Sequence, residues 1–356
     1  MIALALLCTI GLAVGFLLLL HVPLCRDEPA ECAPSCSIII PARNEARNLP
    51  KLLMSIGNRV DGTEVIVVDD QSTDGTASVA VQHGARVVAA PPLAAGWTGK
   101  TSACVTGAAA ARHDVLLFID ADTCFEAGGV EKLLQTFTTL RPGPVAFSVV
   151  PFHVTSNLYE ELSIFFNLMM IFGAGGFGTL GHGRLFGQSL VISSQLYRCS
   201  GTHAAVRSEI LENFAFAGSV ADAGGRCICM GGRGTLRMRM FSDGFAQLCE
   251  GWTKAFASGA AASSEAVLAA AVLWLSCLCG AAIWLVVASG ASRGVAAAFY
   301  LCFALQTGWF AHQVGSFRWY TSAVYPVPLL FFFIIFGRSL KRRAFGQPVA
   351  WRGRQV

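Results

Sequence analysis

The sequence predicts an α/β domain with a mostly parallel sheet, placed between an N-terminal transmembrane helix and a C-terminal bundle of transmembrane helices. Three observations support this prediction. From residue 37 onward, short β-branched runs alternate with helical patterns, which is typical of parallel sheets. Only 13% of the 356 residues are charged and 54% are hydrophobic, whereas roughly 25% of the residues of a soluble domain are charged. Long apolar segments also lie near both ends of the chain.

The first segment, residues 2–20, is apolar and uncharged. Its length is close to the ~20 residues that are needed to cross the core of a bilayer. A cleaved signal peptide is the alternative interpretation, but such a peptide has a basic region before the apolar stretch, and this start has none. We therefore expect an uncleaved anchor over residues 1–24, followed by a polar linker over residues 25–36.

The α/β domain is expected over residues 37–260. Its strands are predicted from SIII, EVIVVDD, ARVVAA and DVLLFID, and helical patterns separate them. In open parallel sheets, ligands bind at the carboxyl ends of the strands. The polar clusters PARNEARN, DDQSTDGT and DADT each follow a strand directly, so we expect a ligand site at this edge of the sheet.

The C-terminal membrane region is expected over residues 261–340. It contains three apolar segments near 266–288, 295–310 and 323–337, and a basic tail follows at 341–356. Three full spans after a cytosolic domain would place the tail outside the cell, whereas basic residues favour the cytosolic side. The sequence therefore leaves the number of spans open, with one re-entrant segment as an alternative.

Composition argues against two classes of function. The formal net charge is only +4 and the basic residues do not form one large patch, so no nucleic acid partner is expected. The 13 cysteines are irregularly spaced without a C-x-x-C pair, which argues against a disulfide framework or a zinc site. Reduced thiols instead suit a domain that faces the cytosol.

Asp120 and Asp122 are the strongest candidates for a metal site. Alternate residues of a strand share a face, and two carboxylates that share a face repel each other unless a cation lies between them. Mg²⁺ and Mn²⁺ prefer carboxylate, water and phosphate oxygens, and a sugar diphosphate would supply the phosphates. Lys100 is expected to add a second positive charge, with a solvated surface lysine as the alternative.

A nucleotide pocket is expected beside this site. Asp70, and with it Asp69, ends the second strand, where a carboxylate can accept hydrogen bonds from a base or a ribose hydroxyl. Pro41, Asn44 and Glu45 would line the other side of the base pocket. Acidic residues that follow a strand also serve as turn formers or helix caps.

The motifs PARNE, VVDDQSTDGT, GWTGK and DADT resemble, in order and spacing, those of the inverting family 2 glycosyltransferases with a GT-A fold. GWTGK at 96–100 with LLFIDADT at 116–123 is most similar to the membrane-bound branch that glycosylates carotenoid or hopanoid lipids, such as the diaponeurosporenoate glycosyltransferases. The resemblance covers roughly residues 36–260. It implies a GT-A-type domain, a nucleotide-sugar donor (UDP-sugar first), a lipid acceptor, and Mg²⁺ or Mn²⁺ as the cofactor.

The resemblance also implies roles for donor-side residues. Asp70 would bind the nucleoside, Asp120 the ribose or diphosphate, and Asp122 the metal. Family members carry an acidic base on a later loop, usually inside an E-D pair. The stretch identified as its match is 216–223, which makes Asp222 the candidate catalytic base, although Ala221 replaces the glutamate.

Acceptor-side residues are expected farther along the chain. Gln247, Gly251 and Trp252 belong to a stretch similar to the Q-x-x-R-W motif of processive synthases, but the arginine is missing, which argues against polymer synthesis. The E-G-W-T-K form resembles the lipid-glycosylating branch. Trp252 would stack on the sugar or acceptor, or else lie at the membrane interface. His203, in a stretch that resembles G-G-H-x-A-V, would lie near the acceptor or be a structural histidine.

Residues 158–172 form another apolar segment, which Glu160 and Glu161 interrupt. The uninterrupted part is too short for a membrane span. We expect an interfacial helix or part of an acceptor channel here.

The predicted function is single displacement at the anomeric carbon of the donor, by a multi-pass enzyme of the cell membrane with its catalytic domain in the cytosol. A hydroxyl acceptor would need Asp222 as a base, whereas a lipid carboxylate is already ionised. The alternatives are a polyprenyl-phosphate sugar transferase and a non-catalytic scaffold that binds nucleotide sugars. Other enzymes of the same lipid pathway are possible partners. A transporter is disfavoured because the apolar segments contain few charged residues.

Overall fold

The computed structural model describes the chain except for residues 27–32, 58–61, 141–142, 175–176, 180–183, 210, 263, 346–349, 352–353 and 356. The described residues divide into two compact units. The α/β unit comprises 23–152, 183–238 and 350–356, and the helical unit comprises 1–22, 153–182 and 239–349. Residues 153–182 and 239–260, which we expected in the α/β domain, thus belong to the helical unit.

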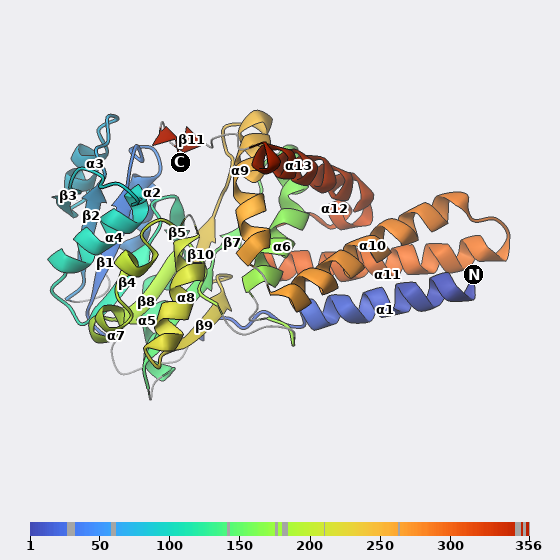
Figure 1. Cartoon of the computed structure of the whole chain (residues 1–356), viewed down its shortest axis with the longest axis horizontal. Helices are drawn as coiled ribbons and strands as arrows, with labels where there is room; N and C mark the ends of the chain where they lie inside the picture. Colours follow the sequence, from blue (N-terminus) through green and yellow to red (C-terminus); the bar gives the residue numbers. More distant parts are fainter. Residues whose placement is uncertain are drawn as a thin grey trace. The chain divides into compact units, whose positions relative to one another are not determined.

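The α/β unit is built on a seven-stranded sheet with the order β3-β2-β1-β4-β8-β6-β9 (Figure 1). The strands are β1 (Cys36–Ala42), β2 (Glu64–Asp69), β3 (Arg86–Ala89), β4 (Val115–Ile119), β6 (Val145–Val150), β8 (Ser189–Ser193) and β9 (Arg226–Gly231). All pairings are parallel except those of β8, which runs antiparallel to β4 and β6. The prediction of a mostly parallel sheet is therefore confirmed.

Helices cover both faces of this sheet, because its central strands are apolar on both sides. Ile38 and Ile40 of β1 point into one buried cluster, whereas Ile39 between them points into the other. The helices of this unit are α2 (Leu49–Ile56), α3 (Thr76–Gln82), α4 (Gly99–Ala110), α5 (Gly129–Thr139), α7 (Ser194–Cys199), η2 (His203–Val206) and α8 (Glu212–Asp222).

Smaller strands complete the α/β unit. β5 (Thr123–Phe125) pairs antiparallel with β10 (Leu236–Met238), and the chain leaves the unit through β7 (Phe152–His153). Near the C-terminus, β11 (Ala350–Trp351) pairs with β12 (Arg354–Gln355).

The helical unit contains two helices long and apolar enough to cross a membrane, α10 (Glu265–Val287) and α11 (Ala291–Val314). α1 (Ile2–Leu18) is also apolar but has only 17 residues. The remaining helices are η1 (Leu158–Ser163), α6 (Ile164–Ala174), α9 (Phe245–Ala262), α12 (Trp319–Ala323) and α13 (Pro326–Ala344). The third apolar segment of the C-terminal region, 323–337, thus falls in α12 and α13 and is not among these candidate spans.

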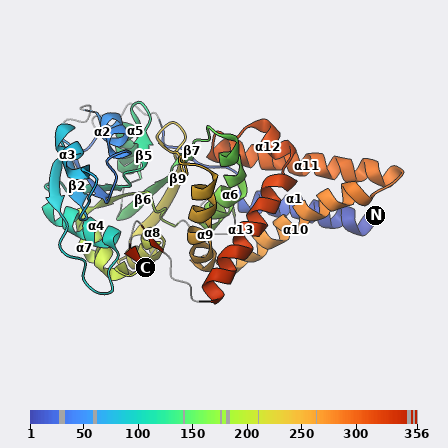
Figure 2. The ribbon, with the colours of Figure 1, turned by 90° about the horizontal axis from the view of Figure 1, so that it is seen from above.

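α1 lies beside α10 and α11 in both views of the helical unit (Figures 1 and 2). Gly11 and Gly15, one helical turn apart, allow this close approach, because a Cβ atom at Gly11 would clash with Cys277. The side chain of Gln306 then links the three helices. It accepts a hydrogen bond from the indole of Trp274 at 2.8 Å and donates one to the carbonyl of Leu12 at 2.7 Å. Close packing at small residues and interhelical hydrogen bonds are both typical of membrane helices.

Candidate functional site

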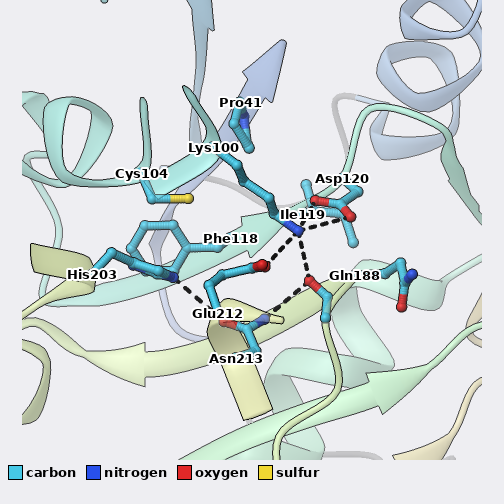
Figure 3. A pocket seen from close by; sticks show the side chains of 11 residues that line it. Pro41, Lys100, Cys104, Phe118, Ile119, Asp120, Gln188, His203, Glu212 and Asn213 are labelled. Atoms are coloured by element: carbon cyan, nitrogen blue, oxygen red, sulfur yellow. Dashed lines mark hydrogen bonds and ion pairs between the residues drawn. The ribbon is translucent and has the colours of Figure 1, made fainter. Parts of the chain in front are cut away.

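A small pocket lies at the carboxyl ends of β1 and β4, the edge at which the sequence predicts a ligand site (Figure 3). Its lining residues are Pro41, Lys100, Cys104, Phe118, Ile119, Asp120, Gly187, Gln188, His203, Glu212 and Asn213. Its free volume is about 10 Å³, which is room for about one water molecule. Three of the predicted donor-side residues, Pro41, Lys100 and Asp120, are therefore brought together here.

Lys100 occupies the centre of this pocket. It lies in the first turn of α4, whose N-cap Thr98 accepts a hydrogen bond from the backbone of Thr101. The Lys100 Nζ lies 2.7 Å from Asp120 Oδ1 and 2.9 Å from Oδ2. It also lies 2.7 Å from Glu212 Oε1 and donates to the carbonyl of Gly187 at 2.9 Å (Figure 3). The alternative of a solvated surface lysine is wrong.

The charges of this cluster stabilise one another. Burial disfavours the ammonium form of Lys100, but the carboxylates of Asp120 and Glu212 outweigh this effect and raise its pKa. Burial raises the pKa of the Glu212 carboxyl, and the attraction of Lys100 opposes that shift. Lys100 is therefore a permanent cation that two carboxylates hold.

Asn213 and His203 form a hydrogen-bond network behind the cluster. The Asn213 amide donates to the carbonyls of Phe186 and Gly187, both at 3.0 Å. Its Oδ1 lies 3.4 Å from His203 Nε2, and the other ring nitrogen lies 2.8 Å from the hydroxyl of Tyr197. Burial, together with the charge of Lys100, lowers the pKa of His203 to about 3. His203 is thus a neutral structural histidine beside the pocket, which agrees with the second of its two predicted roles.

The loops after β1 and β2 are tied to each other at the same edge of the sheet. The backbone nitrogens of Asn44 and Glu45 donate to the hydroxyls of Ser72 and Thr76, at 3.0 and 2.9 Å. Asp74 accepts from the backbone nitrogen of Ala46 at 3.0 Å. Asn44 and Asp74 therefore help to hold these two loops together.

The acidic residues predicted for the donor site differ in burial and in their contacts. Asp70 is buried, with its Oδ2 3.8 Å from Arg43, whereas Asp69 Oδ1 accepts from the backbone nitrogen of Ser72 at 3.2 Å. Glu45 is buried and accepts from the Asn48 amide at 2.8 Å. Asp122 is exposed in the turn between β4 and β5.

Asp222, the predicted catalytic base, is not in this pocket. It is the last residue of α8 and is exposed, whereas Glu212 and Asn213 at the first turn of the same helix line the pocket. Ten residues of helix correspond to about 15 Å. Sequence reasoning missed Glu212 and Asn213, although Glu-Asn is close in form to the E-D pair that was sought.

Of the predicted acceptor-side residues, His203 lies in the α/β unit, whereas Gln247, Gly251 and Trp252 lie in the helical unit, where their contacts are structural. Gln247 exchanges two hydrogen bonds with Asp243 at the start of α9. A Cβ atom at Gly251 would clash with the ring of Phe241. Trp252 is only 2% exposed, so it offers no surface for the stacking on a substrate or the interfacial anchoring that we expected.

The packing of Trp252 explains why it is buried. Its indole donates to the Ser163 hydroxyl at 3.0 Å and stacks on Phe166 with the ring centroids 4.7 Å apart. The E-G-W-T-K stretch thus joins α9 to η1 and α6.

A metal site of three or more protein side chains is absent from the described residues. Mg²⁺, however, commonly takes only one or two carboxylates and completes its shell with water and substrate phosphates. Asp120 and Glu212 already hold one cation between them, the Lys100 ammonium. The Asp120 carboxylate fits a divalent ion that takes its remaining ligands from water and a bound diphosphate.

Comparison with known proteins agrees with this geometry. The sequence profile of Glycosyl transferase family 2 matches residues 37–214. The 4,4'-diaponeurosporenoate glycosyltransferase of Staphylococcus aureus strain MRSA252 is 34% identical over 328 residues, which is 90% of this chain and 87% of the relative. The protein of the same name from the bovine strain RF122 / ET3-1 is 34% identical over 330 residues, 90% of this chain and 88% of that one.

The fold is also similar to that of solved structures. The mannosyltransferase PcManGT from Pyrobaculum calidifontis, in complex with GDP-Man and Mn²⁺, superposes with a TM-score of 0.57. The match covers 97% of this chain and 99% of the other, at 17% identity.

Proposed function

This chain belongs to glycosyltransferase family 2, and we propose that it is a membrane enzyme that transfers a sugar from a nucleotide-sugar donor to the carboxylate of a lipid, with inversion. The observation that carries the proposal is the Lys100–Asp120–Glu212 cluster at the carboxyl edge of the sheet. In the proposed complex, the Lys100 cation of this cluster would lie beside the leaving diphosphate. The relatives named for diaponeurosporenoate, a carotenoid acid, support the acceptor class.

The donor would bind across the loops that follow β1, β2 and β4. Asp70 and Asp69 would contact the nucleoside of a UDP-sugar, with Pro41, Asn44 and Glu45 lining the base pocket. Asp120 and Asp122 would hold Mg²⁺ or Mn²⁺. When bound, the metal neutralises charge on the diphosphate.

In the proposed reaction, an acceptor oxygen forms a bond to the anomeric carbon as the bond to the diphosphate breaks on the opposite side. Lys100 stabilises the charge that develops on the leaving group, because a preorganised cation needs no rearrangement during the reaction. The electron pair of the broken bond leaves with the nucleoside diphosphate.

The contacts of Asn213 support a carboxylate as the acceptor. Its amide cannot take a proton, and both of its hydrogens are donated to backbone carbonyls. Glu212 is engaged by Lys100, and Asp222 lies at the far end of α8. A hydroxyl acceptor must lose a proton as it attacks, whereas a carboxylic acid with a pKa near ~4 is already ionised at neutral pH. Because the described residues that line this pocket include no free base, a carboxylate acceptor is favoured, and the product would be a sugar ester.

The apolar helices α10 and α11 support a membrane location, in which a lipid acceptor is accessible. We propose that α1, α10 and α11 cross the membrane, so that the two C-terminal spans return the chain to the side from which it left. The α/β segments and the basic tail would then share the cytosolic side, where nucleotide sugars occur. This arrangement removes the conflict between three C-terminal spans and the positive-inside rule.

α13 would lie at the cytosolic membrane surface. Val327, Leu330 and Ile334 form an exposed apolar stripe along it, and Arg338 and Lys341 continue this stripe with exposed basic side chains. Apolar residues followed by basic ones are typical of helices that rest on anionic lipids.

The first experiment is release of nucleoside diphosphate by the detergent-purified protein, with UDP- and GDP-sugars, Mn²⁺ or Mg²⁺, and a total lipid extract. We expect lipid-stimulated release that Asp120→Asn abolishes. Binding of donors without release, under all of these conditions, would instead support the non-catalytic scaffold. A phosphodiester product would identify a polyprenyl-phosphate sugar transferase.

A further inference from the structure

The Lys100 ammonium has more acceptors than protons. Four oxygens lie within 2.9 Å of its Nζ, two from Asp120, one from Glu212 and one from the Gly187 carbonyl, whereas an ammonium has three donors. The free space beside it holds about one water molecule. Lys100 therefore lies between the two carboxylates, and both oxygens of Asp120 are in contact with it.

We propose that Lys100 is a resident counter-ion that keeps the divalent metal from Asp120 until a diphosphate is present, so that metal binding depends on the donor. This inference rests on the proposed function. A metal that entered alone would have to share Asp120 with the ammonium or displace it, and in either case two cations in a half-buried site repel each other strongly. A diphosphate removes this obstacle, because its oxygens accept the ammonium and also ligate the metal.

Glu212 and Gly187 give Lys100 a second position. The Glu212 side chain is 4% exposed and lies in the first turn of α8, so its position beside Lys100 is fixed. The Gly187 carbonyl is held by the Asn213 amide at 3.0 Å. Lys100 can therefore give up Asp120 and keep these two partners, with one proton directed to the phosphate. Glu212 and Asn213 act as positioning residues for this exchange.

The test is direct measurement of Mn²⁺ binding to the purified full-length protein, by electron paramagnetic resonance of free Mn²⁺, with and without UDP. For the wild type, we expect weak binding alone and a large gain with UDP. Lys100→Met should tighten binding without UDP by about 10- to 100-fold, the range in which neighbours of metal ligands tune affinity, and should reduce the gain from UDP. Lys100→Arg, which keeps the cation, should resemble the wild type.

Tighter Mn²⁺ binding by Lys100→Met could also result from the more negative charge of the cluster. The double variant Lys100→Met/Glu212→Gln separates this explanation from the release of Asp120. It has the same net formal charge in the cluster as the wild type, but Asp120 is free. We expect it to bind Mn²⁺ without UDP about as tightly as Lys100→Met does. In Lys100→Met two carboxylates lose their cation, whereas in the double variant only Asp120 does. The double variant is therefore expected to be more stable, and its Mn²⁺ affinity tests the proposal if Lys100→Met does not fold.

Two outcomes are distinguishable. If the wild type shows UDP-dependent Mn²⁺ binding and neither Met variant binds Mn²⁺ more tightly alone, the role of Lys100 is refuted while the proposed function stands. If the wild type binds neither UDP nor Mn²⁺ under any condition, the proposed function itself is refuted.

Discussion

The amide nitrogen of Asn213 donates a hydrogen bond to the backbone carbonyl of Gly187 at 3.0 Å, and the same carbonyl accepts from Lys100 at 2.9 Å. The Gly187 carbonyl thus connects helix α8 to Lys100, the cation that we propose stabilises the leaving group. The same amide also holds the carbonyl of Phe186. An amide at this position fixes the loop before β8, and a carboxylate would not.

Asn213→Asp is therefore expected to destabilise the protein. An ionised carboxylate would face two carbonyl oxygens in a buried site and would lose two donated hydrogen bonds, which we expect to cost roughly 2–4 kcal/mol. The unfolding free energy in detergent measures this effect. A variant of wild-type stability with increased turnover of an alcohol acceptor would show instead that this position can hold a working base.

Gly251→Ala should lower stability by about 1–3 kcal/mol, because the added methyl group clashes with Phe241. Gly280→Ala, in α10 of the same unit, is the matched control. Its Cβ atom would meet nothing within 4 Å, and alanine stabilises a helix relative to glycine by up to about 1 kcal/mol. Normal stability of Gly251→Ala with a raised acceptor KM would mean that this glycine contacts the substrate.

Stability should fall in mild acid because of His203. Its pKa is lowered to about 3 in the folded protein, against roughly 6.5 in an unfolded chain. Between these values the unfolded state binds one more proton, so the contribution is fully present above pH 6.5 and is lost as the pH falls. The slope is about 1.4 kcal/mol per pH unit. Between pH 7 and 5, the free energy of unfolding of His203→Asn should fall less steeply with pH than that of the wild type, by about this slope. The same slope in both proteins would argue against a neutral buried histidine.

Reporter fusions test the topology in a bacterial host. Green fluorescent protein fused after the last residue should fluoresce, because the basic tail is expected in the cytosol. Alkaline phosphatase should be active when it is inserted at the α10–α11 turn, residues 288–290, and inactive when fused at the C-terminus. Activity of the C-terminal phosphatase fusion would support a third C-terminal span.

The sheet could be predicted because its signals are local. The β-branched runs and the polar residues that end them lie within a few positions, so the strands, Asp120 and Lys100 were all found at the same edge. The antiparallel direction of strand β8 has no such local signal, since strand direction depends on partners distant in the sequence.

Glu212 illustrates what sequence reasoning could not provide. A glutamate at the start of a helix is a common surface feature, and only the fold shows that this one is buried against Lys100. Trp252 shows the reverse, since a tryptophan in a motif of the family is packed against Phe166 and Ser163. In both cases the role depends on contacts between segments far apart in the chain.

The most direct test of the central claim offers the purified enzyme a long-chain polyene acid and the alcohol of the same chain, with the nucleotide sugar that it hydrolyses or transfers best and with Mn²⁺. We predict transfer to the acid at neutral pH, an alkali-labile sugar ester as the product, and near-normal turnover for Asp222→Asn. Transfer to the alcohol alone, together with loss of activity in Asp222→Asn, would contradict the account and restore Asp222 as the base.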